Sequence, residues 1–290
     1  MKKYRAVFIG NRPLIISSLV KHEQIDLVQA FVIEGSLISK NDYVDTPITI
    51  CNANSQNQIV EFLKLGEYDL CVSAGCPYIL PVDLFPADKI FINTHPSALP
   101  FGRGIHPINE CIFSNHRKAG ATVHYLTNEL DAGDVIHQVV FDITDDIDLD
   151  LLYSIIFEVE QEVFNAGLEK VLSSNLKYQG IQQQGVGTYY SRKEHDQYVD
   201  ISTIDTVTFL KKVRAFSASS LGIHVNLGNE EIIIFMASSI VNPFVKNRFE
   251  LYQAGKVLIS NNKFLLVKLI DGIVRIDKWL SKSNISGMTL

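Results

Sequence analysis

The sequence has few cysteines and none of the patterns typical of a disulfide framework or a zinc site. Its 290 residues include four cysteines, with no CxxC pair and no Cys/His cluster at metal-ligand spacing. Most of them lie in or beside apolar stretches, which is typical of buried, reduced thiols. We therefore expect a cytoplasmic protein without a metal centre. The cysteines are Cys51, Cys71, Cys76 and Cys111.

A long hydrophobic run and an excess of positive charge are also missing. No apolar stretch reaches the ~20 residues of a transmembrane helix, and the apolar run in the opening "MKKYRAVFIGNRP" is too short for a signal peptide. The chain has 26 Lys and Arg against 32 Asp and Glu, a formal charge of −6. Nucleic-acid binding needs clustered cations. We therefore expect neither a membrane nor a nucleic acid as partner.

Over the first 180 residues, apolar runs alternate with amphipathic segments. Strands are expected at 4–9, 26–33, 47–51, 69–73, 89–92, 121–126 and 135–141. Helices are expected over 55–68 with Ser55 as the cap, over 106–119 with Gly120 past the end, and over 149–172. Strands that alternate with helices predict an α/β fold with a mainly parallel, covered sheet.

After residue 180 the composition changes. The segment 178–187, "YQGIQQQGVG", is polar and glycine-rich and is interpreted as a linker. A short helix near 205–214 precedes two β-rich stretches, 221–236 and 263–279, with turns expected at Gly228–Asn229 and Asp271–Gly272. This pattern predicts two domains, a larger one over 1–180 and a small β-rich one over 181–290.

Two short stretches bring together side chains that suit chemistry. In "NTHPSALPFGRG" (93–104), Asn93 and His95 follow the strand at 89–92 and face the same way on an extended backbone. Open α/β sheets bind ligands at the carboxyl ends of their strands. In a parallel sheet, the loop after 121–126 would approach the same end, so we expect Asp131 of "LDAGDVI" to meet His95.

An amide, an imidazole and a carboxylate suit the transfer of an acyl group onto an amine. Asn93 can donate to a carbonyl oxygen that gains negative charge. His95 can remove a proton from the attacking amine, directly or through water, or stabilise the oxyanion as an imidazolium. Asp131 can orient His95 and favour its protonated form. No GxSxG motif is present, and none is needed when the substrate amine attacks. Taken alone, Asn93 and His95 also fit a turn residue and a structural histidine.

The combined pattern resembles the N10-formyltetrahydrofolate-dependent formyltransferases. The family pattern is N-x-H-x-S-x-L-P, then R-G-x-x-P, G-x-T-x-H and D-x-G-D. The matching residues are Asn93, His95, Ser97, Leu99, Pro100, Arg103, Gly104, Pro107, Gly120, Thr122, His124, Asp131, Gly133 and Asp134. The resemblance covers most of residues 1–180. It implies a Rossmann-like fold, a catalytic triad of Asn93, His95 and Asp131, and N10-formyltetrahydrofolate as formyl donor.

The resemblance also implies where the pterin of the donor binds. Its cleft would be lined by the loops 73–81 and 126–134, whose backbone groups can read the edge of the ring. The implied cofactor contacts are Tyr78, Ile79, Leu80 and Asp134. Core packing is the alternative for the three apolar residues, and bracing of its own loop is the alternative for Asp134.

The acceptor is expected to be the amine of a nucleotide-linked 3- or 4-amino-dideoxy sugar, such as a dTDP sugar used for surface polysaccharide. The segment 187–201 resembles the one that follows the catalytic core of sugar N-formyltransferases. Its tyrosines can stack on a base, and its cations can meet a diphosphate. The implied substrate contacts are Arg12, His106, Tyr189, Tyr190, Arg192 and Lys193. A surface turn, a helix border and a charged linker are the structural alternatives.

Other functions fit less well. Methionyl-tRNA formyltransferase, the main alternative, needs a basic insertion for tRNA, but the matching region 34–54 contains only Lys40 as a basic residue. A nicotinamide oxidoreductase would need GxGxxG after the first strand. A formyltetrahydrofolate hydrolase would use water in place of the amine, and a sugar-binding protein would not need the triad. The β-rich tail could form a homodimer.

Overall fold

Two units make up the chain. The computed structural model describes residues 2–113, 117–218, 220–228 and 230–281. The first unit comprises 1–107, 118–142 and 154–190, and the second comprises 108–117, 143–153 and 191–290. The expected domain boundary at residue 180 stays a prediction, and by its contacts the chain finally enters the second unit at residue 191.

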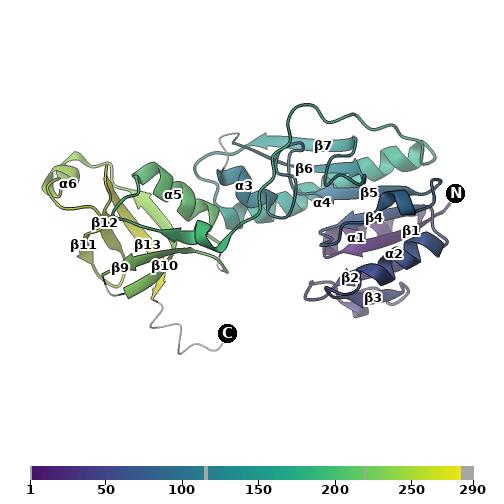
Figure 1. The fold of residues 1–290 in the computed structure, drawn as a ribbon, viewed down its shortest axis with the longest axis horizontal. Coiled ribbons are helices and arrows are strands. Elements are labelled where there is room, and N and C mark those ends of the chain that lie inside the picture. Colours follow the sequence, from purple (N-terminus) through teal and green to yellow (C-terminus); the bar gives the residue numbers. More distant parts are fainter. Residues whose placement is uncertain (1, 114–116, 219, 229, 282–290) are drawn as a thin grey trace. The chain divides into compact units, whose positions relative to one another are not determined.

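The first unit is built on a seven-stranded sheet in the order β3-β2-β1-β4-β5-β6-β7 (Figure 1). Its strands are β1 (Tyr4–Gly10), β2 (Ile25–Ile33), β3 (Ile48–Cys51), β4 (Leu70–Ala74), β5 (Ile90–His95), β6 (Lys118–Tyr125) and β7 (Val135–Asp142). Strands β1 to β5 pair in parallel. The last two pairings, β5–β6 and β6–β7, are antiparallel. The expected mainly parallel α/β sheet is confirmed.

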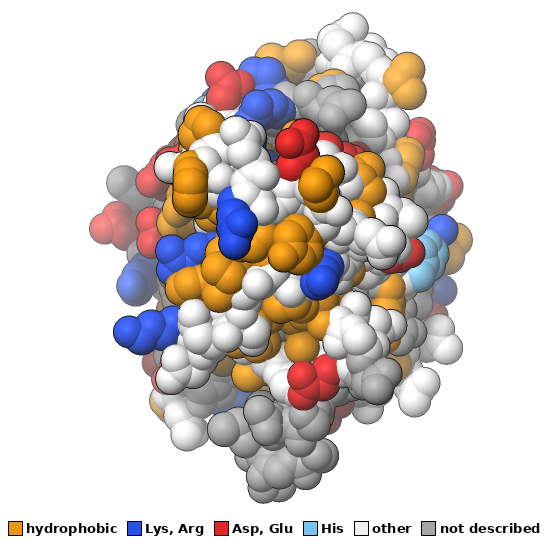
Figure 2. Space-filling model, turned by 90° about the vertical axis from the view of Figure 1, so that its left-hand side faces the viewer, with side chains coloured by type: hydrophobic (Ala, Val, Ile, Leu, Met, Phe, Trp, Pro, Cys, Tyr) orange, Lys and Arg blue, Asp and Glu red, His pale blue; other side chains and the backbone are white. Residues whose placement is uncertain are grey.

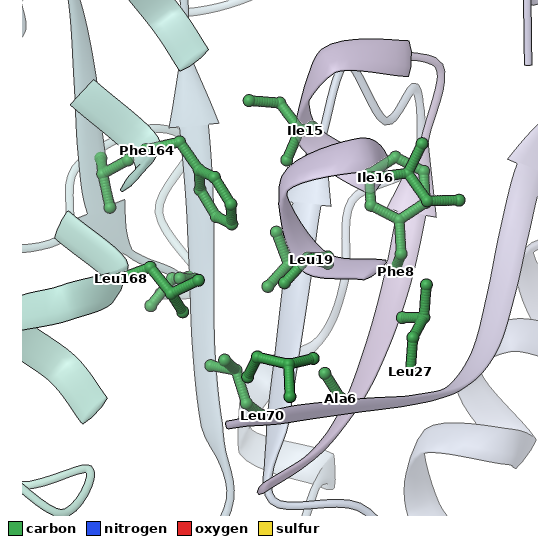
Figure 3. Packing of buried hydrophobic residues seen from close by; sticks show 14 of the residues in the cluster. Ala6, Phe8, Ile15, Ile16, Leu19, Leu27, Leu70, Phe164 and Leu168 are labelled. Atoms are coloured by element: carbon green, nitrogen blue, oxygen red, sulfur yellow. The ribbon is translucent and has the colours of Figure 1, made fainter. Parts of the chain in front are cut away.

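Helices cover both faces of this sheet because its strands are apolar on both sides. The helices of the first unit are α1 (Pro13–Lys21), α2 (Gln56–Leu65) and most of α4 (Leu149–Ser173), with short 3-10 turns η1 (Lys40–Asp42) and η2 (Val82–Leu84). Helix α3 (Pro107–Phe113) lies almost entirely in the second unit. Helices α1 and α4 contribute to one buried cluster, and α2 to another on strands β1, β2 and β4. In Figure 3, Leu19 of α1 lies between Phe164 of α4 and the strand residues Ala6 and Leu70.

Three local expectations differ from the structure. Helix α1 had no counterpart among the expected helices, although Pro13 at its first turn and the buried Ile15, Ile16 and Leu19 are suitable signals. Ser55 precedes α2, but its hydroxyl accepts from the backbone N–H of Asn52 and does not cap the helix. The expected helix over 106–119 ends at Phe113, and residues 114–116 lie outside the described part.

Gly120 does not terminate a helix, because it lies within β6. A Cβ at this position would come within 2.1 Å of the carbonyl oxygen of Val139 on β7. The glycine is therefore needed for close strand pairing and not for a C-cap. The expected role of Gly120 at the end of a helix is therefore wrong.

The second unit contains a six-stranded sheet in the order β11-β12-β13-β10-β9-β8, antiparallel except for β8–β9. Its strands are β8 (Tyr198–Val199), β9 (Ile223–Leu227), β10 (Glu230–Ser239), β11 (Val257–Ser260), β12 (Leu265–Lys268) and β13 (Ile273–Ser281). The helical elements are η3 (Glu194–Gln197), α5 (Thr206–Ala215) and α6 (Pro243–Arg248). The expected β-rich C-terminal region is confirmed, while Asn229 of one expected turn lies outside the described residues.

Segments from earlier in the chain complete this second unit. The side-chain amide of Asn109 donates to the carbonyl of Ala215 at 2.9 Å, and the N–H of Leu149 donates to the hydroxyl of Ser217 at 2.9 Å. Both contacts are buried.

Among the helices that the structure describes, none is long and apolar enough to cross a membrane.

The packing of α1 predicts a contrast between two neighbouring positions. We expect Leu19→Ala to lower the free energy of unfolding by about 2–5 kcal/mol, because Leu19 is fully buried and its truncation leaves a cavity. Val20→Ala on the same helix is the control, since Val20 is 45% exposed and surface changes usually stay within about 0.5 kcal/mol. Urea titration measures both. Equal losses in the two variants would contradict the packing described here.

Candidate active site

The end of β5 presents two polar side chains on one face of the sheet. Strand β5 continues to His95, so Asn93 and His95 lie inside the strand and not past its end as expected. They are two residues apart and therefore share a face, while Thr94 points to the opposite one. Their exposed fractions are 8% and 6%. The site is thus built on a rigid strand within the sheet.

Antiparallel pairing with β6 adds a second histidine. Asn93 lies directly opposite His124 in the β5–β6 register. The Asn93 side-chain nitrogen lies 3.1 Å from Nε2 of His124, and Nδ1 of His124 lies 2.8 Å from the carbonyl oxygen of Tyr125. Because a carbonyl only accepts, Nδ1 of His124 carries a proton, and in the tautomer protonated there alone Nε2 accepts from the Asn93 amide. His124 thereby fixes the amide of Asn93.

Asp131 reaches this face by a different route from the one expected. Because β6 runs antiparallel to β5, the loop after β6 starts beside Ile92 and not at the carboxyl end of β5. The loop then folds back: Asp131 adopts a φ of 52°, and a Cβ on Gly133 would lie 1.8 Å from the carbonyl oxygen of Tyr125. Only glycine permits this close approach. Asp131 therefore reaches His95 through a folded-back loop after an antiparallel strand, and the expected parallel approach is wrong.

The three groups that the sequence analysis singled out converge in one cluster. Nδ1 of His95 lies 3.7 Å from Oδ2 of Asp131, and Nε2 of His124 lies 3.6 Å from Oδ1 of the same carboxylate. The backbone N–H of Gly104 donates to Asp131 at 2.8 Å. On its other side, Nε2 of His95 lies 2.7 Å from the carbonyl oxygen of Gly102. We assign the imidazole proton to Nε2, which leaves Nδ1 facing the carboxylate.

Burial decides the protonation of the cluster. It lowers the pKa of His95 below its usual value, although Asp131 and the carbonyl of Gly102 act in the opposite direction. Burial alone would raise the pKa of Asp131, but His95, His124 and the N–H of Gly104 hold it well below its usual value. Asp131 does favour the imidazolium, as expected, yet burial has the larger effect. Near neutral pH the site therefore holds a neutral imidazole beside a carboxylate.

An ion pair between a partly exposed arginine and a buried glutamate lies behind β5. Nε of Arg12 lies 3.0 Å from a carboxylate oxygen of Glu160, whose other oxygen accepts from the hydroxyl of Thr94 at 2.9 Å. Burial raises the pKa of Glu160, and Arg12 opposes that shift. Glu160 was missed in the sequence, although a Glu spaced four residues from Ile156 and Phe164 on an apolar helix face signals a buried partner. Arg12, an expected anion contact, already has a carboxylate beside it.

The other expected substrate contacts belong to different parts of the chain. In the first unit, His106 and Tyr190 are partly buried, and the hydroxyl of Tyr189 accepts from Arg103 at 3.1 Å. Arg192 and Lys193 belong to the second unit. There the backbone N–H of Lys193 donates to a carboxylate oxygen of Asp196 at 2.8 Å.

A hydrogen bond joins the expected pterin loop 126–134 to η2, the turn that directly follows the other expected loop, 73–81. The amide of Asn128, after β6, donates to the carboxylate of Asp83, in η2 after β4. Each loop exposes an apolar side chain, Ile79 at 64% and Leu130 at 43%. Exposed apolar groups on adjoining loops fit a flat heterocycle.

The remaining expected cofactor contacts differ in their surroundings. Leu80 is buried in the core, and the hydroxyl of Tyr78 donates to the carbonyl of Asn52 at 2.5 Å. Asp134 is exposed, and its backbone carbonyl, not its carboxylate, accepts from Tyr125 at 3.0 Å. Within the described ranges, no group of three Cys, His, Asp or Glu side chains could hold a metal ion.

Comparison with known proteins identifies a family and curated relatives that are methionyl-tRNA formyltransferases. The formyl transferase family matches residues 11–168. The methionyl-tRNA formyltransferase of Lactococcus lactis subsp. cremoris (strain SK11) is 26% identical over 230 residues, 79% of this chain and 70% of that protein. The methionyl-tRNA formyltransferase of Thermotoga maritima is 28% identical over 188 residues, 64% of this chain and 59% of that protein.

Solved structures share the fold over nearly the whole chain. An N-formyltransferase from Helicobacter canadensis, solved with folinic acid and dTDP-3-aminofucose, aligns with a TM-score of 0.72 at 18% identity, covering 97% of this chain and all of that one. HypX from Aquifex aeolicus, solved with tetrahydrofolic acid, aligns with a TM-score of 0.67 at 18% identity. The match covers 99% of this chain and 47% of HypX, so the chain spans about half the length of HypX.

The electrostatics of the cluster predict how His95 titrates. We expect its pKa, followed by NMR of the imidazole, to lie below the usual ~6.5. Asp131→Asn should lower it further, because the carboxylate favours the charged ring. Asp134→Asn is the matched control on the exposed part of the same loop. A pKa that does not respond to Asp131→Asn would show that the carboxylate and the ring are not coupled in solution.

Proposed function

The chain belongs to the formyl transferase family, and we propose that it transfers a formyl group from N10-formyltetrahydrofolate to the amine of a nucleotide-linked amino-dideoxy sugar. One observation carries the proposal: the amide of Asn93, the imidazole of His95 and the carboxylate of Asp131 converge in one buried cluster. These groups supply an oxyanion donor, a general base and a carboxylate that stabilises the charged base. The set needs no protein nucleophile.

Asn93 stabilises the developing negative charge. When the amine attacks, a carbon–nitrogen bond forms and the formyl oxygen becomes an oxyanion. One N–H of the Asn93 amide is directed at His124, and the other is available to this oxygen. Because the amide is fixed before the reaction and lies in a buried site, its donation costs little reorganisation.

His95 moves the proton. Its Nε2–H is directed at the carbonyl of Gly102, so Nδ1 is the nitrogen that accepts the proton of the attacking amine. Asp131 then stabilises the imidazolium. The same proton passes to the leaving nitrogen as its bond to the formyl carbon breaks. The products are the formamido sugar nucleotide and tetrahydrofolate.

The donor binds against the two joined loops. Ile79 and Leu130 supply exposed apolar contacts, and Tyr78, Leu80 and Asp134 shape the loops around them. The joining bond between Asn128 and Asp83 keeps the two loops together before the donor arrives. This arrangement supports folate as the donor and assigns no further cofactor.

Charge and the solved neighbours support a sugar nucleotide as the acceptor. The formal charge of −6 disfavours a polynucleotide, whereas one diphosphate needs only a few cations. The Helicobacter canadensis enzyme was solved in complex with dTDP-3-aminofucose, and its fold matches this chain end to end. We propose His106, Tyr189 and Tyr190 as sugar or base contacts, while Arg12, Arg192 and Lys193 stay predicted diphosphate contacts. The formamido sugar would serve surface polysaccharide synthesis in the cytoplasm.

Methionyl-tRNA formylation is the second candidate, because the two relatives from Lactococcus lactis and Thermotoga maritima are named methionyl-tRNA formyltransferases.

We further propose that the second unit forms a homodimer. Figure 2 shows hydrophobic side chains gathered with lysine and arginine side chains on one face of the second unit. The strongly exposed apolar residues of that unit include Val241, Phe244 and Leu251. Such exposed apolar groups are typical of a protein interface.

A substrate panel separates the two candidates. We expect folate-dependent formylation of dTDP-3-amino or dTDP-4-amino dideoxy sugars, measured by mass spectrometry of the nucleotide sugar. Initiator methionyl-tRNA should accept no formyl group under the same conditions. Omission of the donor is the control. Formylation of the tRNA alone would replace the proposed acceptor, and formylation of neither would contradict the proposal.

The triad predicts two distinct kinetic losses. Asn93→Ala should lower kcat by roughly 10²- to 10³-fold, the usual cost of removing one oxyanion donor. His95→Ala should abolish measurable transfer, because no base then faces the amine. Thermal melting should show that both variants fold. Turnover near the wild-type rate in folded His95→Ala would contradict the assigned base.

A further inference from the structure

The segment Gln183–Tyr189 crosses the loops that hold the triad, and its first five residues belong to the expected linker 178–187. After α4 the chain runs back to β7, where Ile181 forms a β-bridge with Val135 (Figure 1). It then reaches Arg103, which forms a parallel bridge with Tyr189. We define Gln183–Tyr189 as the strap. It contacts one loop on each side of His95.

The amino end of the strap holds the loop of Asp131. The side-chain nitrogen of Gln183 donates to the carbonyl oxygens of Asp131, at 2.8 Å, and Gly133, at 2.9 Å. Its side-chain oxygen accepts from Arg103 at 2.8 Å. Gln183 is only partly exposed and uses both ends of its amide. It therefore ties the folded-back loop to the loop that follows β5.

The carboxyl end of the strap holds the loop of Gly102. The hydroxyl of Thr188 accepts from the N–H of Gly102 at 2.8 Å, and the carbonyl of Thr188 accepts from the N–H of Arg103 at 2.9 Å. The N–H of Thr188 donates to the carbonyl of Pro100 at 3.2 Å. Gly102 is the residue whose own carbonyl faces Nε2 of His95.

Tight packing leaves the strap little freedom. A Cβ on Gly187 would lie 2.8 Å from Nε of Arg103, so glycine is needed for this approach. Arg103 is 9% exposed, and its guanidinium also donates to Glu129 and to the hydroxyl of Tyr189. The strap and Arg103 thus form one hydrogen-bonded unit.

We propose that the strap positions the imidazole of His95 from both of its nitrogens, with Thr188 acting through Gly102 and Gln183 acting through Asp131. Neither residue touches the reacting atoms, so both are positioning residues. The inference rests on the proposed role of His95 as the base. A displacement of about 1 Å in such a group can cost roughly 100-fold in rate. Thr188 and Gln183 therefore contribute to kcat and not to substrate affinity.

Two substitutions separate positioning from general support. Thr188→Val keeps the shape but removes the acceptor for Gly102. Gln183→Glu keeps an acceptor for Arg103 but places a carboxylate against two carbonyl oxygens. We expect each to lower kcat by roughly 10- to 100-fold, with the KM of both substrates within about twofold of wild type. Thr188→Ser should restore kcat to within about threefold, because it keeps the hydroxyl.

A charge-matched control is available one residue before the strap. Gln182 is exposed, and Gln182→Glu adds the same charge as Gln183→Glu without the carbonyl contacts. Its kcat should equal that of wild type. Thermal melting shows which variants fold, and if one of the two strap variants does not fold, the other carries the test. Values of kcat within about threefold of wild type in the folded strap variants would overturn the proposal.

The pKa of His95 gives a readout that needs no activity. The groups that act on this ring are Asp131 and the carbonyl of Gly102, which favour its charged form, and His124 and Arg12, which oppose it. If Thr188→Val releases Gly102, the pKa of His95 measured by NMR should fall. An unchanged or higher pKa would overturn the proposal. This measurement remains decisive for the strap even if the wild type formylates no sugar nucleotide.

Discussion

The close backbone approach at Gly133 is the contact on which the candidate site depends. It lets the loop after β6 fold back onto its own strand, and this fold-back carries Asp131 to His95 and His124. A side chain at this position would collide with the carbonyl of Tyr125. Without the fold-back, the antiparallel direction of β6 would carry the loop toward the start of β5. Gly133 thus allows Asp131 to reach His95 although β6 runs antiparallel to β5.

The site is an electrostatic compromise between burial and pairing. Burial keeps His95 neutral, and the same burial makes the carboxylate of Asp131 a strong partner for any imidazolium that forms. Arg12 pairs with the buried Glu160 on the other side of β5, and its charge also disfavours the imidazolium of His95. The imidazole of His95 is consequently neutral before the reaction, and the carboxylate of Asp131 stabilises it once it has taken up a proton. This order of events suits proton removal from an amine.

The triad and the strap lie in different parts of the chain. The family match ends at residue 168 and includes the whole triad. The strap begins at Gln183, after that match, yet it contacts the loops on both sides of His95. The chain that follows contains the predicted diphosphate contacts Arg192 and Lys193. A change in the region after residue 168 could therefore alter both the recipient and the rate.

The sequence by itself determined the chemical groups and the mainly parallel sheet, because strand periodicity and the motifs around Asn93, His95 and Asp131 are local patterns. It did not determine the path by which Asp131 arrives, the buried partner of Arg12 or the role of segment 178–187. Only the tertiary structure decided these three features. They depend on the direction of β6, on the close backbone approach that Gly133 permits, and on contacts between residues 80 or more positions apart. Local composition describes a glycine-rich segment equally well as a free linker or as a strap.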